Sequence, residues 1–186
     1  QNFENIMTEK IEWQAELVEP KHPALHTKAT LDPFKSDVDW VERQQAMFQI
    51  MHENIGIGLA APQCGDQHRM FVMTHSTKGD IGIFNPVILA KSETSCVIEE
   101  GCLTFPLLYL NITRPDEVVV RYQTDDATVV NETLNGLDAR VFQHELDHLE
   151  GVLFIDSEYA SDLKLKRAFA KREKTFKKMM EMKVNG

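Results

Sequence analysis

The chain has 186 residues, of which 42% are hydrophobic and 26% charged, a composition typical of a folded domain that excludes wholesale disorder. Its net charge of −9 argues against general nucleic-acid binding, and it has no run of apolar residues long enough to cross a membrane. We therefore expect neither DNA nor a membrane as a partner. Because the three cysteines form no C-x-x-C motif and cannot all pair, we expect reduced thiols in the cytoplasm or an equivalent reducing compartment.

The charge is distributed unevenly along the chain. Residues 161–183 carry nine Lys or Arg and three Asp or Glu, whereas all other residues together are strongly acidic. We therefore expect one domain over residues 7–160 and a basic amphipathic helix over residues 161–186, which a polyanionic partner would contact. We interpret residues 1–6, ahead of Met7, as a cloning remnant.

The first third of the chain predicts an arm followed by a helix. Prolines break residues 11–36 into an extended arm with turns. Apolar residues at helical spacing then predict a helix from Val38 to Asn54, with Asp37 as its cap. The small residues of segment 56–63 exclude a long regular element but allow another group to approach the backbone closely. A plain turn is the simpler interpretation of this segment.

The middle of the chain is rich in β-branched and aromatic residues. It predicts five short strands, at residues 69–73, 83–89, 96–100, 117–122 and 128–134. We expect Asn85-Pro86 to end the second strand early and Asp125-Asp126 to turn the last two into a hairpin. The fold class that follows is a single α+β domain, with antiparallel or mixed β-sheets around a central helix and a long C-terminal helix.

The central helix contains the sequence QHELDH at residues 143–148. Its two histidines, His144 and His148, lie four residues apart on one helical face, where they can bind one divalent metal ion. Leu137 and Val141 continue that face, so we expect both imidazole rings to point into the protein. Glu145 lies about 100° around the helix and can act on a water molecule beside the metal.

A catalytic metal site of this kind needs a third protein ligand. Cys102 is the best candidate, because a thiolate binds metal strongly and the adjacent glycine allows close backbone approach. The alternatives are the downstream carboxylates Asp156 and Glu158, which a zinc endopeptidase would use. The other two cysteines, Cys64 and Cys96, are expected to be buried structural residues.

Three segments resemble, in order, the three signature motifs of the peptide deformylases. They are GIGLAAPQ at residues 56–63, EEGCLT at residues 99–104 and QHELDH at residues 143–148. Weaker similarity extends the resemblance over residues 17–156. The resemblance implies an enzyme that hydrolyses the formyl group from N-formylmethionyl peptides and nascent chains and releases formate.

The resemblance also implies a role for each motif residue. Cys102, His144 and His148 would bind the metal, which in the family is usually Fe²⁺, with Zn²⁺, Ni²⁺ or Co²⁺ able to replace it. Glu145 would be the acid/base residue. Gln63 and the backbone N–H of Leu103 would bind the formyl oxygen. The remaining site candidates form an apolar pocket for the formylated methionine: Ile57, Gly58, Leu137 and Val141.

Around these motifs the chain shows both support and departures. Arg114 can pair with Glu100 and so steady the cysteine loop, and Gln143 and Asp147 are expected to support the metal helix. Thr104 stands where the family more often has serine, which keeps the hydroxyl. Residues 105–109 (FPLLY) lack the glycine or charged residues common in the family at this point.

Two other functions compete with deformylation. A zinc endopeptidase would use the same helix with a downstream acidic ligand in place of Cys102. A metal-binding protein without turnover would have lost its reactive residues, but Glu145, Gln63 and Cys102 are all present.

The C-terminal helix carries two stripes of side chains. The basic stripe consists of Lys164, Arg167, Lys171, Lys174 and Lys178. The apolar stripe consists of Leu165, Phe169, Phe176 and Met180, which we expect to pack on the body. Since formylated chains exist chiefly at the ribosome, we expect the basic stripe to dock on ribosomal RNA. A solvated charged face is the alternative.

Overall fold

The computed structural model describes residues 11–156 and 158–186, so the expectation for residues 1–6 and Met7 lies outside the described residues. The helices are α1 (Trp40–Glu53), α2 (Gly136–Leu149) and α3 (Asp162–Asn185), with short 3-10 turns at Pro23–His26, Pro33–Lys35 and Ala61–Cys64. The strands are β1 (Gly58–Ala60), β2 (Met70–His75), β3 (Gly79–Lys91), β4 (Ser95–Cys102), β5 (Phe105–Pro115), β6 (Glu117–Gln123) and β7 (Val129–Asn135).

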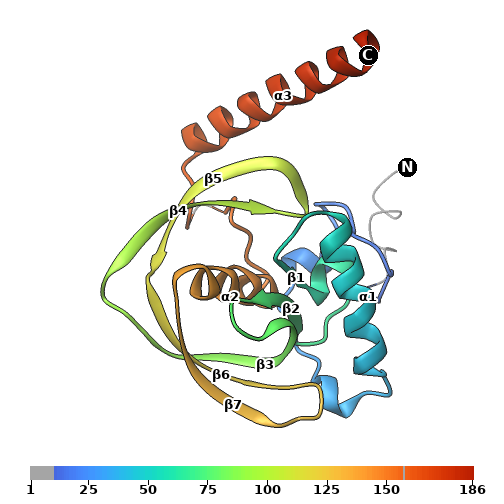
Figure 1. Ribbon diagram of the computed structural model, residues 1–186, viewed down its shortest axis with the longest axis vertical. Coiled ribbons are helices and arrows are strands. Elements are labelled where there is room, and N and C mark those ends of the chain that lie inside the picture. The colour runs from blue at the N-terminus through green and yellow to red at the C-terminus, as the bar shows by residue number, and fades with distance from the viewer. Residues whose placement is uncertain (1–10, 157) are drawn as a thin grey trace, which may run out of the picture.

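The strands form two antiparallel sheets that enclose α2. One sheet has the order β1-β2-β3-β6-β7, and the other pairs β4 with β5. Figure 1 shows α2 in the middle, with β4 and β5 on one side of it and β3, β6 and β7 on the other. The predicted α+β fold with a central helix is therefore confirmed.

Three groups of buried apolar side chains hold these layers together. The first lies between the five-stranded sheet and α2, where Phe142 packs edge-on against Phe71. The second joins α1 to β1 and β2 through residues such as Met47 and Met51. The third lies under β5 and reaches the first turns of α3. Because α2 lies between the two sheets, most of its polar side chains are buried as well.

The ends of the helices follow ordinary capping chemistry. Asp39, not Asp37 as predicted, caps α1 by accepting a hydrogen bond from the Glu42 N–H at 3.1 Å, so the helix begins at Trp40. The helix α2 ends where Gly151 adopts a φ of 72° and its N–H binds the His148 carbonyl. A Cβ at Gly151 would lie 3.0 Å from the backbone of Thr27, so glycine is required there on two counts.

Two strand predictions were wrong. Asn85-Pro86 does not end β3, because the chain passes through a bulge, with Asn85 at a φ of 48°, and pairing with β6 resumes at Val87. Segment 105–115, for which we predicted no strand, is β5, and its alternate residues Leu108, Leu110 and Ile112 are buried. Segment 56–63 is a short strand followed by a 3-10 turn rather than a plain turn.

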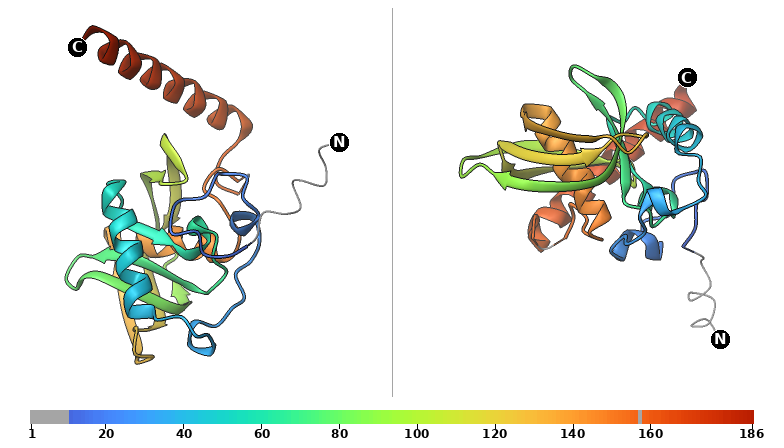
Figure 2. Two further views of the ribbon diagram at one scale, coloured as in Figure 1. Left: turned by 90° about the vertical axis from the view of Figure 1, so that its right-hand side faces the viewer. Right: turned by 90° about the horizontal axis from the view of Figure 1, so that it is seen from below.

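The helix α3 extends away from the rest of the molecule, as the left view of Figure 2 shows. Only its first turns contact the body, where Leu165 and Phe169 pack on the third apolar group. Phe176 and Met180 are 41% and 62% exposed, so the expectation that the whole apolar stripe packs on the body was wrong for its outer half. None of the helices in the described part of the chain combines the length and hydrophobicity that crossing a membrane requires.

Candidate metal centre

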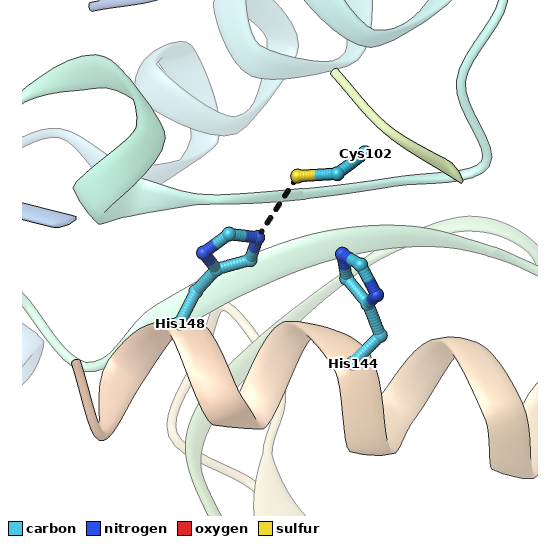
Figure 3. Close-up of side chains that lie close together, drawn as sticks. All are labelled: Cys102, His144 and His148. Carbon is cyan, nitrogen blue, oxygen red and sulfur yellow. Dashed lines mark hydrogen bonds between the residues drawn. The ribbon is translucent and has the colours of Figure 1, made fainter. Parts of the chain in front are cut away.

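The two histidines and the cysteine of the motifs converge at one point. Ligand atoms of Cys102, His144 and His148 all lie within 4.8 Å of one another. The Cys102 sulfur is 3.5 Å from Nε2 of His148, and Figure 3 shows both rings rising from α2 toward the cysteine. Tetrahedral ligation at ordinary bond lengths would place a sulfur and a nitrogen roughly 3.6 Å apart. The spacing of the donor atoms therefore fits a single divalent metal ion.

A carboxylate orients the first histidine. Nδ1 of His144 donates to Oε1 of Glu100 at 2.8 Å, which leaves Nε2 to face the cysteine sulfur. This is the usual way in which a metal-binding histidine has its tautomer and ring orientation fixed. Nδ1 of His148 is buried and has no hydrogen-bond partner among the residues that the structure describes.

Glu100 is held by two arginines as well. Arg114 donates from Nε at 2.6 Å and from Nη2 at 3.0 Å, and Arg140 donates from Nη1 at 2.7 Å. Burial opposes the charge on Glu100, but the hydrogen bonds from His144 and Arg114 outweigh it and hold its pKa well below the ordinary value. With four donors around it, this carboxylate has one available orientation. The expected pair of Arg114 with Glu100 is thus present.

We did not predict the role of Arg140. It is buried and also donates to the carbonyls of Ile112 and Cys96, so it ties β4 and β5 to α2. The sequence spacing could have indicated this role, because Arg140 precedes His144 by four residues and therefore lies on the same inward face of the helix. A cation on such a face indicates a buried carboxylate partner.

Glu145 is buried and lies on the wall of the same cleft as Cys102 and His144. Its Oε2 is buried and accepts no hydrogen bond within the described ranges 11–156 and 158–186. Burial raises the pKa of Glu145 to about 7. A Cβ at Gly58 would lie 2.9 Å from Oε1 of Glu145 and 2.9 Å from Val141, so glycine is what allows β1 to pass this close.

Gln63 and Leu103 approach the same point from the other side. Oε1 of Gln63 accepts a hydrogen bond from the Ala60 N–H at 2.9 Å, which fixes the amide. Nε2 then points to the hydroxyl of Thr104 at 3.1 Å and to the sulfur of Cys102 at 3.6 Å. Leu103 follows directly after Cys102, and its side chain packs against Gly56.

A cleft of about 480 Å³ opens over this group of residues. All four predicted pocket residues line it: Ile57, Gly58, Leu137 and Val141. Val141 is buried, whereas Leu137 is 58% exposed, so the predicted inward face of the helix reaches the surface at Leu137. Cys102, Leu103 and Glu145 lie on the walls of the same cleft.

The alternative third ligands lie elsewhere. Asp156 accepts a hydrogen bond from the Leu153 N–H at 2.8 Å and shapes the turn before α3, and Glu158 is exposed. Cys64 is fully buried, and Cys96 is half-buried beside Arg140. Among the residues that the structure describes, Cys102 alone completes a metal-binding group with the two histidines.

The remaining motif residues support α2 as expected. Nε2 of Gln143 donates to the carbonyls of Pro115 and Ala139, and Asp147 accepts a hydrogen bond from Arg114 at 2.8 Å. Both side chains point away from the metal ligands, toward β5 and the turn before α3.

Comparisons with known proteins agree with this geometry. Residues 14–164 match the family model described as Polypeptide deformylase. Peptide deformylase of Thermotoga neapolitana is 47% identical over 112 residues, which cover 60% of this chain and 68% of that protein. Peptide deformylase of Bradyrhizobium diazoefficiens is 41% identical over 140 residues, covering 71% and 79%.

Solved structures of peptide deformylases have the same fold. The Thermotoga maritima structure gives a TM-score of 0.72 at 38% identity and covers 78% of this chain and 97% of its own. The Synechococcus elongatus structure gives 0.77 at 32% identity and covers 85% of each chain. The chain therefore belongs to the polypeptide deformylase family, the metal-dependent hydrolases that remove the formyl group from formylated peptides.

Proposed function

We propose that Cys102, His144 and His148 bind the metal ion with which this chain deformylates N-formylmethionyl peptides. The observation that carries the assignment is the convergence of their three donor atoms within 4.8 Å beside the cleft. The hydrogen bond from Nδ1 of His144 to Glu100 supports the assignment, because it leaves Nε2 unprotonated and oriented to bind a metal ion. When bound, a divalent metal supplies a Lewis acid and makes water a nucleophile near neutral pH.

Glu145 is the acid/base residue in this proposal. Its position next to His144, on the wall of the cleft, supports the role, as does the unpaired Oε2 noted above. It takes a proton from the attacking water and passes it to the amine that leaves with the peptide. A residue in this role contributes roughly 10² to 10⁴ in rate.

Gln63 and Leu103 bind the formyl oxygen as negative charge develops on it. The Gln63 amide is held at both ends, so Nε2 can donate without first being ordered. The backbone N–H of Leu103 is the second donor. Each donor of this kind contributes roughly 3 kcal/mol to the transition state.

The methionine side chain of the substrate lies between Ile57, Gly58, Leu137 and Val141. The support is that these residues line the cleft that also contains Glu145. Their apolar side chains suit an unbranched thioether, and the cleft is of the right order of size for a short peptide segment.

Release of formate tests the proposed function directly. Anaerobically purified protein is incubated with a formyl-Met-Ala-Ser peptide, and formate and free amine are measured together. We expect equal amounts of both products and no internal cleavage. Cleavage within the peptide would indicate a zinc endopeptidase, and metal binding without either product would indicate a binding protein.

We further propose Fe²⁺ as the working metal, in a cytoplasmic or equivalent reducing environment. The support is the cysteine in the ligand group together with the two other free thiols. A ferrous centre with a thiolate ligand is open to oxidation, so the iron form should lose activity in air several-fold faster than the nickel form. Equal half-lives of the two forms in aerated buffer would count against iron.

The basic stripe of α3 is proposed to bind ribosomal RNA. In support, α3 has no buried residue and extends away from the acidic body (Figure 1), and Lys164 near its start donates to the Asn111 carbonyl. The zinc, nickel or cobalt form of the protein should bind ribosomes as well as the iron form does, because the basic stripe is remote from the cleft. Phosphate contacts would make binding weaken steeply with salt.

Cosedimentation with ribosomes at two salt concentrations tests this proposal. The variant carries Lys171→Glu, Lys174→Glu and Lys178→Glu, and the control carries the same change at the exposed residues Lys21, Lys35 and Lys91. We expect only the α3 variant to lose binding, since both have the same net charge. Equal pelleting of the two variants would show that α3 does not recognise the ribosome.

A further inference from the structure

Tyr159 lies outside the three motifs, in the segment between α2 and α3, yet it contacts the arginine that holds Glu100. Its hydroxyl donates to Oδ2 of Asp147 at 2.6 Å and accepts a hydrogen bond from Nη1 of Arg114 at 3.1 Å. Its ring lies under the guanidinium of Arg114, 4.5 Å from centroid to carbon. Burial and the neighbouring Asp147 raise the pKa of Tyr159, so the hydroxyl remains a donor at neutral pH.

Arg114 and Asp147 also belong to a closed ring of hydrogen-bonded side chains that begins and ends on α2. From Asp147 on α2 the ring passes to Arg114 on β5 at 2.8 Å, then to Glu100 on β4, and returns to α2 at His144. The same ring fixes the position of β4 relative to α2, and β4 ends at Cys102. It therefore sets the spacing of ligands that come from two different elements.

The side chain of Tyr159 covers this hydrogen-bonded ring on the side away from the cleft. A groove of about 940 Å³ lies there, lined by Tyr159, Asp147 and Arg114 together with β3 residues 86–91. Arg114 is only 3% exposed although it borders this groove, and the ring of Tyr159 is stacked against its guanidinium. Without Tyr159, water would reach the guanidinium and compete for the bonds that it gives to Glu100.

We infer that Tyr159 is a positioning residue for the metal site, which acts through Arg114 and Glu100 on His144 and Cys102. The inference rests on the proposed ligand assignment. Tyr159 touches neither substrate nor metal ligand, so its removal should weaken metal retention and leave the pocket for methionine intact. Changes in residues that support metal ligands cost 10- to 100-fold in affinity or activity, and we expect about tenfold here.

The test compares two tyrosine-to-phenylalanine variants of the cobalt-loaded protein. Tyr159→Phe removes the hydroxyl but keeps the ring over Arg114. The matched control is Tyr122→Phe, which also removes a hydroxyl that donates to a carboxylate, from Tyr122 to Glu132 at 2.7 Å, on the opposite sheet. The measurements are the rate of cobalt loss to excess chelator, the visible absorption of bound cobalt, and kcat and KM separately.

We expect Tyr159→Phe to lose cobalt about tenfold faster, with a shifted cobalt spectrum, a lower kcat and an unchanged KM. Tyr159→Leu should show a larger change, and Tyr122→Phe should behave as the wild type in all four measurements. Wild-type cobalt loss from Tyr159→Phe, or equal acceleration in the control, would overturn the role of Tyr159 alone. Tight cobalt binding by Cys102→Ala would overturn the ligand assignment as well.

Discussion

The helices α2 and α3 are both amphipathic and rich in charge, but they lie in opposite surroundings. Nine of the 14 residues of α2 are buried, and its side chains Arg140 and His144 converge on one carboxylate. None of the 24 residues of α3 is buried, and the helix extends away from the rest of the molecule (Figure 1).

This difference shows what a charge can do in each setting. Where sheets surround a helix, a buried ionisable group is either paired, as Glu100 is with Arg114 and Arg140, or has its pKa shifted toward the neutral form, as Glu145 has. On a helix in water, charged side chains are mobile and screened, so they contribute little to stability and act mainly on other molecules that come into contact with the helix. Changes on α2 should therefore have large, local effects, whereas changes on α3 should have small ones.

The largest effect is expected from Glu145→Gln. Turnover should fall by roughly 10² to 10⁴, because glutamine cannot carry the proton, while metal content stays at the wild-type value. The measurement is kcat together with metal analysis. Glu150→Gln is the control, since this exposed carboxylate follows directly after α2 and pairs with Arg69 away from the cleft. Near wild-type turnover of Glu145→Gln would refute its assigned role.

Cys102→Ala should come next. Loss of a ligand should reduce metal affinity by more than the roughly 100-fold upper value for supporting residues, and activity should fall with it. Cys64→Ala and Cys96→Ala should keep both metal and activity, because neither thiol belongs to the ligand group. Full and tight metal occupancy in Cys102→Ala would transfer the third ligand to another residue.

Arg140→Met tests the buried charges of α2 without touching a metal ligand. Metal-free protein should lose about 3 kcal/mol of unfolding free energy, since the change leaves Glu100 and two buried carbonyls short of a donor. Urea unfolding measures this. Arg121→Met, which removes an exposed arginine bonded to Asn131, should cost less than about 0.5 kcal/mol. Equal losses of unfolding free energy in the two variants would contradict the idea that buried charges on α2 matter more than exposed ones.

The smallest effect is expected on α3. Changing Lys171, Lys174 and Lys178 together to glutamine should alter the unfolding free energy by less than about 0.5 kcal/mol and leave kcat unchanged. The same urea series provides the measurement. A loss above about 1 kcal/mol would mean that α3 is held against another surface in solution, and the contrast with α2 would disappear.

Much of the site could be predicted because its chemistry is local in sequence. The spacing of His144 and His148 places both on one helical face whatever surrounds them, and a glycine beside Cys102 permits close approach. The fold class followed from the alternation of strand patterns. Each of these predictions depends on residues within a few positions of one another.

The rest depends on contacts between distant segments. The strand β5 was missed because FPLLYL is nearly uniform in polarity, and Leu107 departs from strand geometry with a φ of 61°. The bulge at Asn85 lies where the pairing of β3 with β2 ends and its pairing with β6 continues, so its position depends on two other strands. The contact of Tyr159 with Arg114 joins residues 45 positions apart, and no local pattern predicts it.

The arginine pair around Glu100 has a consequence for how the enzyme acquires its metal. His144 is oriented by bonds among the chain's own side chains, so folding can be completed before any ion arrives. Small zinc domains differ, because there the ion itself drives folding and a chelator unfolds the chain. In this chain we therefore expect a chelator to remove the ion and leave the fold intact.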